Sequence, residues 1–237
     1  MLPATWTSSA VNSDLQPYDR NLFRFADASG SDAILNLVDT SAEAQILEGV
    51  LYSSRDIYRE VAVKIHRLLA RPFELRSPEH PSRFRGGYET GVLYSAETMA
   101  TAALERGYHR VRLLRESPEF EVGTNVPQVL INFDVKTDAI DIRVSPYSRR
   151  KSELEDPNSY AASQEFGRLA RTAGAGAVIY SSARGKSDGP CVALLRPDAL
   201  KTGQPKSLTS AWSVKATKKT AVWVNSETLE VLEFEYQ

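Results

Sequence analysis

The sequence has few of the residues that define metal-binding or disulfide-linked proteins. Cys191 is its single cysteine, which excludes a disulfide within the chain. Its three histidines (His66, His80 and His109) lack the spacing of zinc motifs such as HExxH, so we expect no metal site. No apolar run approaches the roughly 20 residues of a membrane-spanning helix. The first residues show no basic segment followed by an apolar stretch, and we expect a cytoplasmic protein without a signal peptide.

The chain also has no excess of charge of one sign. Its 237 residues include 29 Lys and Arg against 30 Asp and Glu, for a formal net charge of -1. This balance argues against nucleic acid or a membrane surface as the main partner. The apolar residues, 42% of the chain, suffice for one large domain or two small ones, and no change in composition marks a boundary. We therefore predict one domain over residues 21–237, preceded by a loose polar segment over residues 1–20.

The apolar pattern predicts strands and helices in mixed order. Helices are expected at 39–54, at 56–70, from Ser95 or Ala96 onward, and at 158–173 with Gly174 as the cap. Strands are expected at 22–27, 91–95, 177–182 and 191–197, with hairpins at 127–144 and 211–225. The first hairpin is expected to turn at residues 136–138. Because helices and strands do not strictly alternate, the pattern favours an α+β fold over a doubly wound sheet.

Standard nucleotide-binding and hydrolase motifs are missing as well. There is no GxGxxG after a strand, no GxxxxGK[ST] loop and no GxSxG turn. The run GAGA at 174–177 precedes a strand instead of following one, and is better explained as a helix cap. Cys191 opens an apolar strand with no histidine near it in sequence, which favours a core cysteine over a nucleophile.

Two groups of polar residues lie on segments that are otherwise expected to be buried. Arg83 precedes a strand, Tyr94 ends it, and Glu105 is expected to end the following helix. A carboxylate toward the end of a helix opposes the helix dipole at a cost of roughly a few tenths of a kcal/mol, so Glu105 is either a surface residue or a functional one. The second group, SSAR at 181–184, ends a buried strand and opens a loop, a common place for site residues. The alternative there is a serine-rich turn.

Both groups lie in segments that resemble the RES family, which is named for an arginine, a glutamate and a serine. The first segment is PSRFRGGYETGVLYSAETMATAALERGYHR and the second is GAVIYSSAR. Further resemblance lies in LFRFAD, LVDTSAEAQILEGVL, LLARPFEL, DPNSYAASQEFGRLAR and SAWSV, so that the likeness covers most of residues 20–225.

Residue by residue, the resemblance assigns five site positions in this chain. The family's arginine, glutamate and serine, its early site arginine and its site tyrosine correspond to Arg83, Glu105, Ser182, Arg24 and Tyr94. Some members have proline at the position of Ser181, which leaves Ser181 as an alternative to Ser182. Arg85 is an extra cation to which the resemblance assigns no role.

The resemblance implies a fold similar to that of the ADP-ribosyltransferases, with mixed, mainly antiparallel sheets and flanking helices. It implies an enzyme that consumes NAD+ as an NAD+ phosphorylase or glycohydrolase, with inorganic phosphate as a co-substrate of the first reaction and no cofactor. Many members are toxins held in check by an Xre-type antitoxin, so we expect such a partner. The expected assembly is a homo-oligomer or a toxin–antitoxin hetero-oligomer. Transfer of ADP-ribose to a protein or small molecule, and a non-catalytic binding protein of the same fold, remain alternatives.

The chemistry of NAD+ gives the matched residues their expected roles. Breaking the nicotinamide–ribose bond builds positive charge on the ribose, and Glu105 is the candidate carboxylate that stabilises this charge. Arg24 and Arg83 are expected to clamp the pyrophosphate, because a guanidinium group binds two phosphate oxygens at once.

Three further side chains complete the predicted site. Tyr94 offers an aromatic face to the nicotinamide, and Ser182 offers a hydroxyl to the ribose or the carboxamide. Arg184 is the candidate for binding inorganic phosphate. Glu105, Arg83 and Ser182 form the predicted catalytic set.

Overall fold

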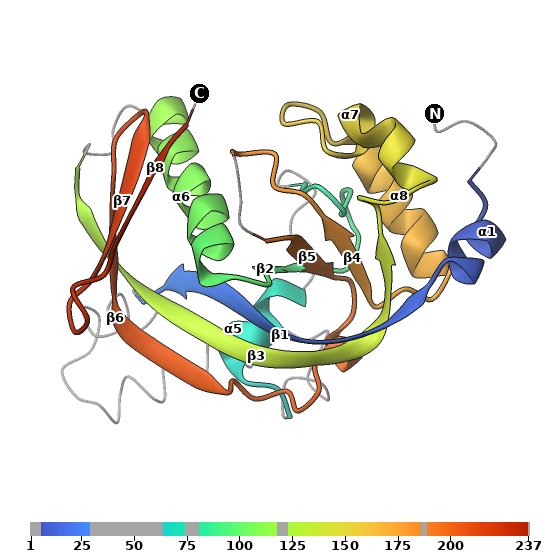
Figure 1. The fold of residues 1–237 in the computed structure, drawn as a ribbon, viewed down its shortest axis with the longest axis horizontal. Helices are drawn as coiled ribbons and strands as arrows, with labels where there is room; N and C mark the ends of the chain where they lie inside the picture. Colours follow the sequence, from blue (N-terminus) through green and yellow to red (C-terminus); the bar gives the residue numbers. More distant parts are fainter. Residues whose placement is uncertain (1–5, 29–63, 74–80, 118–122, 186–188, 237) are drawn as a thin grey trace.

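A computed structural model describes residues 6–28, 64–73, 81–117, 123–185 and 189–236 (Figure 1). The helix expected at 39–54 and most of the one expected at 56–70 lie outside these residues. The end of the second helix is described as α5 (Arg67–Ala70), followed by the 3-10 helix η1 (Arg71–Phe73). Proline cannot donate a backbone hydrogen bond, and Pro72 lies where the α-helix ends.

The described strands form one sheet that closes on itself at one end. They are β1 (Gln16–Asp27), β2 (Leu93–Ala96), β3 (Asn125–Asp141), β4 (Ala177–Tyr180), β5 (Cys191–Leu194), β6 (Ser207–Ala216), β7 (Thr220–Asn225) and β8 (Val231–Glu235). Their order is β1-β2-β5-β4-β3-β6-β7-β8, and β1 also pairs with β3. The first five strands in this order therefore form a closed barrel, and β6, β7 and β8 extend the sheet from β3.

Only β3 and β4 run parallel among these described pairs; the others are antiparallel. The mixed, mainly antiparallel α+β architecture expected from the sequence is confirmed. Its likeness to ADP-ribosyltransferases stays a prediction.

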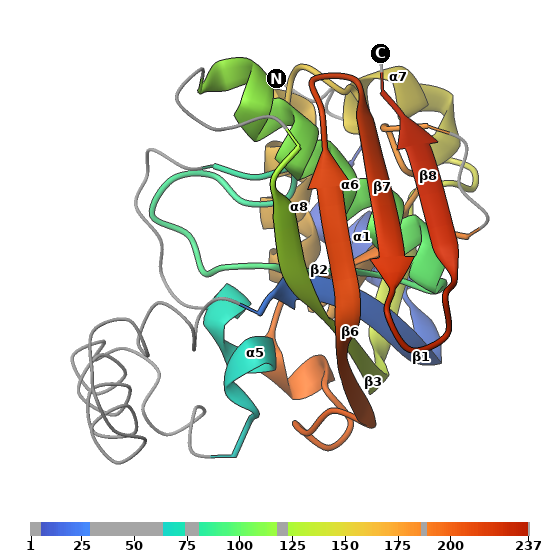
Figure 2. The ribbon, with the colours of Figure 1, turned by 90° about the vertical axis from the view of Figure 1, so that its left-hand side faces the viewer.

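The helices form two groups on either side of a gap. The first is α6 (Met99–Glu116), which packs against β1, β6, β7 and β8 (Figures 1 and 2). The second is α8 (Ala161–Thr172), with α1 (Ser8–Ser13) and α7 (Lys151–Leu154) packed against it. Two short 3-10 helices, η2 (Tyr147–Arg150) and η3 (Pro197–Ala199), complete the described helical elements. The barrel strands thus hold α6 and α8 apart.

The sequence-based hairpin at 127–144 is wrong. Residues 125–141 form the single strand β3, and the predicted turn at 136–138 is ordinary strand that pairs with residues 17–19 of β1. A Lys-Thr-Asp stretch suits a turn, but a long partner strand satisfies its backbone hydrogen bonds and keeps it extended.

The described part of the segment expected to be loose is also corrected. Thr7 caps α1, Val11 of that helix is fully buried, and β1 begins at Gln16. The polar first half of β1 gave no strand signal in the sequence because its exposed residues are held by pairing with β3 and not by burial.

Other expectations are confirmed with shifted ends. β4 and β5 pair as antiparallel neighbours, and β6 and β7 form the predicted hairpin, to which the structure adds β8. Gly174 follows α8 with a φ of 88°, the left-handed conformation of a helix cap. The helix after β2 begins at Met99, where Thr98 accepts a hydrogen bond from the Thr101 amide, a few residues later than expected. It continues to Glu116, so the expectation that Glu105 ends this helix is wrong, and the Glu105 carboxylate lies too far from the last turn to oppose the helix dipole there.

Small residues let α6 approach the sheet closely. Ala102, Ala103 and Gly107 are buried in a cluster with Trp212 and Trp223. A Cβ at Gly107 would meet the Tyr236 hydroxyl and lie 3.0 Å from the Ala221 Cβ. The helix is therefore poor in bulk because the sheet lies too near for larger side chains.

Gly107→Ala should lower the free energy of unfolding by about 1–3 kcal/mol, because the added methyl overpacks this contact. Urea unfolding measures the change. Tyr236→Phe removes the hydroxyl that the methyl would meet, so the same glycine substitution should cost less in that background. An equal cost in both backgrounds would contradict this explanation.

Candidate active site

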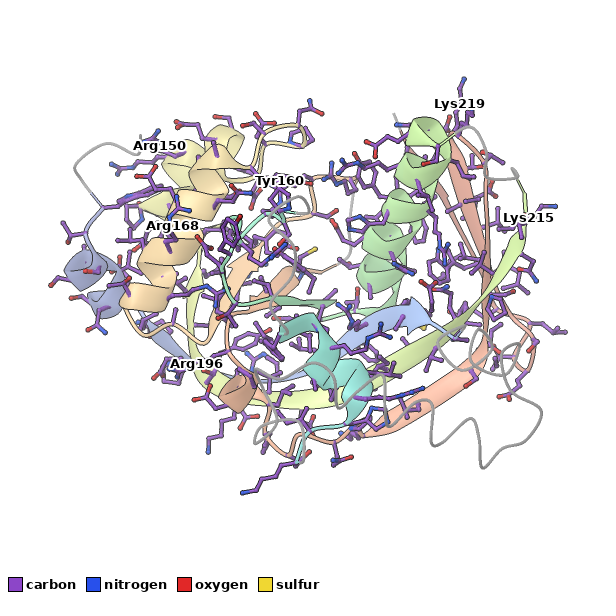
Figure 3. All side chains as sticks on the ribbon, turned by 180° about the vertical axis from the view of Figure 1, so that it is seen from behind. Arg150, Tyr160, Arg168, Arg196, Lys215 and Lys219 are labelled. Carbon is purple, nitrogen blue, oxygen red and sulfur yellow. The ribbon has the colours of Figure 1, made fainter. Side chains whose placement is uncertain are left out.

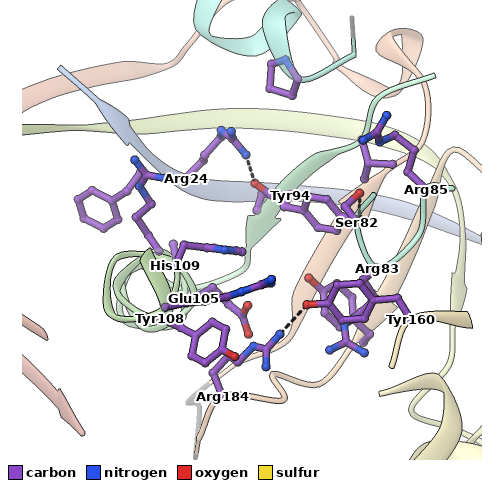
Figure 4. Close-up of a pocket in the computed structure, with 18 of the residues that line it drawn as sticks. Arg24, Ser82, Arg83, Arg85, Tyr94, Glu105, Tyr108, His109, Tyr160 and Arg184 are labelled. Atoms are coloured by element: carbon purple, nitrogen blue, oxygen red, sulfur yellow. Dashed lines mark hydrogen bonds between the residues drawn. The ribbon is translucent and has the colours of Figure 1, made fainter. Parts of the chain in front are cut away.

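A cavity of about 1020 Å³ lies between α6 and the segment that joins α7 to α8 (Figure 4). Its walls come from α6, β1, β2, the loop before β2, the loop before α8 and the segment after β4. Residues far apart in the sequence therefore meet around one space.

The cavity is strongly cationic. The arginines among its described lining residues are Arg24, Arg83, Arg85, Arg106, Arg112, Arg115 and Arg184. Glu105 and Glu116 are the acidic residues of that lining, and Glu116 already pairs with Arg112 at 2.7 Å. Such a surface suits an anionic ligand.

The helix α6 presents a polar face to this cavity. Glu105, His109, Arg112 and Glu116 follow one another at spacings of three and four residues and all line the cavity. The buried residues of α6 include Leu104, Gly107, Val111 and Leu114, which face the sheet. The sequence reading missed His109 and Arg112, although the repeat of polar residues at the helical period was available to reveal them.

Glu105 is held by Ser182. The Ser182 hydroxyl donates to Glu105 Oε1 at 2.6 Å, and Ser182 Oγ also accepts from the Arg184 amide at 3.1 Å. The neighbouring Ser181 instead donates its backbone amide to Glu155 Oε1 at 2.7 Å. The contact with the carboxylate thus belongs to Ser182 and not to Ser181. Ser182 does not appear in the described lining of the cavity, and its hydroxyl is directed to Glu105.

Tyr94 anchors the loop that carries Arg83. Its hydroxyl accepts from the Phe84 amide at 2.9 Å and donates to Ser82 Oγ at 3.0 Å. The buried Arg83 donates from Nη1 to the Leu154 carbonyl at 3.1 Å. Arg24 donates from Nη1 to the Tyr94 carbonyl at 2.6 Å, and both predicted pyrophosphate ligands line the cavity.

Arg184 crosses from the segment after β4 to both sides of the cavity. Its guanidinium carbon lies 3.8 Å from the centroid of the Tyr108 ring on α6. On the other side, its nitrogens donate to the Pro157 carbonyl at 3.1 Å and to the Tyr160 hydroxyl at 2.7 Å. The structure adds Tyr108 and Tyr160, for which the sequence gave no signal. Ser182 contacts the cavity through Glu105, and the other predicted site residues line it: Arg24, Arg83, Tyr94, Glu105 and Arg184.

The family model described as RES domain matches residues 57–215, which is more than half of the chain. The chain belongs to the RES domain family. No curated protein matches it. This RES domain is similar in structure to a chain of the crystal structure of the M. tuberculosis MbcT–MbcA toxin–antitoxin complex, with a TM-score of 0.50 and 11% sequence identity. The match covers 85% of this chain and 90% of that chain, and at this identity it shows a shared fold alone.

Two titratable groups of this RES domain are held in their neutral forms. Burial, and then the charge of Glu105, raise the pKa of the Cys191 thiol well above its usual range, as expected of a core cysteine. His109 still faces the open cavity, but partial removal from bulk water and nearby cations together lower the pKa of its imidazole to about 4. The cations are Arg106, Arg184, Arg112 and Arg24.

Two absences hold for the described part of this RES domain. It contains no group of three or more His, Cys, Asp or Glu residues placed to hold a metal ion. None of its described helices has the length and apolar composition required to cross a membrane.

Proposed function

We propose that this RES domain breaks the nicotinamide–ribose bond of NAD+, by phosphorolysis or hydrolysis. One observation carries the proposal: the Glu105 carboxylate, fixed by a 2.6 Å hydrogen bond from Ser182, lies in a cavity whose described lining includes seven arginines. The substrate has matching chemistry, since its pyrophosphate is anionic and its ribose becomes cationic during the reaction.

Glu105 supplies the charge that the reaction needs. Nicotinamide leaves NAD+ as a neutral molecule, so no general acid has to protonate it, and the transition state resembles an oxocarbenium ion. A carboxylate ~4 Å from that charge, at an effective dielectric constant of ~20, stabilises it by about 4 kcal/mol. This corresponds to a rate increase on the order of 10³-fold. A neutral His109 agrees with a reaction that requires no acid at this position.

The arginines bind the phosphate groups. Arg24 and Arg83 lie beside Tyr94 and are the candidates for the pyrophosphate clamp. The Tyr94 ring lines the cavity and is the candidate surface for the nicotinamide. Arg184 is the candidate ligand of inorganic phosphate in the phosphorolytic reaction.

We further propose that the chain is the toxin of a toxin–antitoxin pair. Membership of the RES family and a fold shared with a chain of the MbcT–MbcA complex support this role. An Xre-type protein is the proposed antitoxin. Transfer of ADP-ribose to a protein or small molecule differs from this reaction only in the acceptor.

Incubation of the purified protein with NAD+ and labelled phosphate tests the reaction and the acceptor together. We expect release of nicotinamide. Label recovered on ribose indicates phosphorolysis, free ADP-ribose indicates hydrolysis, and modified protein indicates transfer. Absence of nicotinamide release, with and without phosphate, would exclude the proposed enzyme.

Ser182→Ala should slow nicotinamide release by about 10- to 100-fold, because a hydrogen bond to a charged group contributes about 1.5–3 kcal/mol. Ser181→Ala is the matched control, since it keeps the backbone amide that binds Glu155 and should retain the wild-type rate. The reverse order of effects would show that the wrong serine has been assigned to Glu105.

A further inference from the structure

Tyr160 contacts two of the cavity arginines at once. The guanidinium carbon of Arg83 lies 4.9 Å from the centroid of its ring, and Arg184 Nη2 lies 2.7 Å from its hydroxyl. Tyr160 directly precedes α8 and lies on the side of that helix that faces α6 (Figure 3). It lines the cavity, but neither the sequence nor the family pattern assigns it a role.

The two arginines come from different segments and are held by the same short stretch of chain. Besides their contacts with Tyr160, Arg83 donates to the Leu154 carbonyl and Arg184 to the Pro157 carbonyl. Residues 154–160 therefore fix both guanidinium groups. Within the described part of the chain, these contacts are to neutral groups, and neither arginine is paired with a carboxylate.

Each contact with the phenol is favourable by itself, but the two guanidinium groups that share it repel each other. Their repulsion is reduced when a phosphate-type group binds between them, and each guanidinium group can then donate to two of its oxygens. Holding the arginines in advance lowers the entropy that the ligand must remove on binding. The arrangement thus has the features of a preorganised anion site.

We propose that Tyr160 is a positioning residue that joins Arg184 to Arg83 of the proposed pyrophosphate clamp, so that the two arginines together bind a diphosphate or phosphate anion. The ring face holds Arg83 and the hydroxyl holds Arg184. A role of Tyr160 in turnover rests on the proposed NAD+ reaction, whereas its role in anion binding does not. The two contacts use different parts of the Tyr160 side chain. A phenylalanine at this position therefore keeps the ring contact with Arg83 and loses the hydrogen bond from Arg184.

Calorimetric titration with inorganic pyrophosphate tests the clamp without any turnover. Tyr160→Phe should weaken binding roughly fivefold, the loss of one net hydrogen bond. Tyr147→Phe is the matched control, because it removes a tyrosine hydroxyl that donates to Asp14 outside the described cavity lining, and it should bind as the wild type does.

A double-mutant cycle shows whether Tyr160 acts through Arg184. Arg184→Met should weaken pyrophosphate binding more strongly, and adding Tyr160→Phe to it should have no further effect. Additive losses, unchanged binding by Tyr160→Phe, or no pyrophosphate binding by the wild type would each overturn the clamp. Binding with the predicted cycle but no nicotinamide release from NAD+ would support the clamp and exclude the proposed reaction.

Discussion

The hydrogen bond from Ser182 to Glu105 joins the two sides of the site. It links the helix α6 to the segment that follows β4, at 2.6 Å. Glu105 lies on α6, which packs against β1, β6, β7 and β8, whereas Ser182 and Arg184 follow the barrel strand β4. The hydrogen bond from Ser182 fixes the negative charge of Glu105 in a cavity whose other charges are mostly positive. The chemistry proposed for NAD+ depends on this one fixed charge.

The rest of the fold keeps that contact in place. The close approach of α6 to β7 at Gly107 fixes the distance between the helix and the sheet. On the opposite side, Gly167 of α8 lies against the backbone of Phe84, where a Cβ would be only 2.6 Å from its carbonyl oxygen. Helices on both sides of the cavity are thus packed too closely for larger residues at these two positions.

The sequence could reveal the site residues that lie in short, ordered motifs. Arg83, Tyr94, Glu105 and Ser182 could be predicted because their family pattern depends on local spacing. The structure places the first three in the lining of one cavity and bonds Ser182 to Glu105. Tyr160 was missed because Arg83 and Arg184 contact it only in the folded chain, where they reach it from distant segments.

The same distinction between local patterns and contacts of distant segments explains which parts of the fold could be predicted from the sequence. The mixture of strands and helices follows from local patterns, such as the Thr98 cap of α6 and the glycine after α8. The continuity of β3 through residues 136–138 depends on its pairing with β1, which no local pattern contains. Closure of the barrel likewise depends on contacts between β1 and both β2 and β3.

The central claim is that Glu105 acts by its charge and not by holding the substrate. Glu105→Gln keeps the shape of the side chain and removes that charge. Equilibrium binding of NAD+ and single-turnover release of nicotinamide should both be measured in this variant. The account predicts binding within about threefold of the wild type and release slower on the order of 10³-fold. Release at the wild-type rate would contradict it.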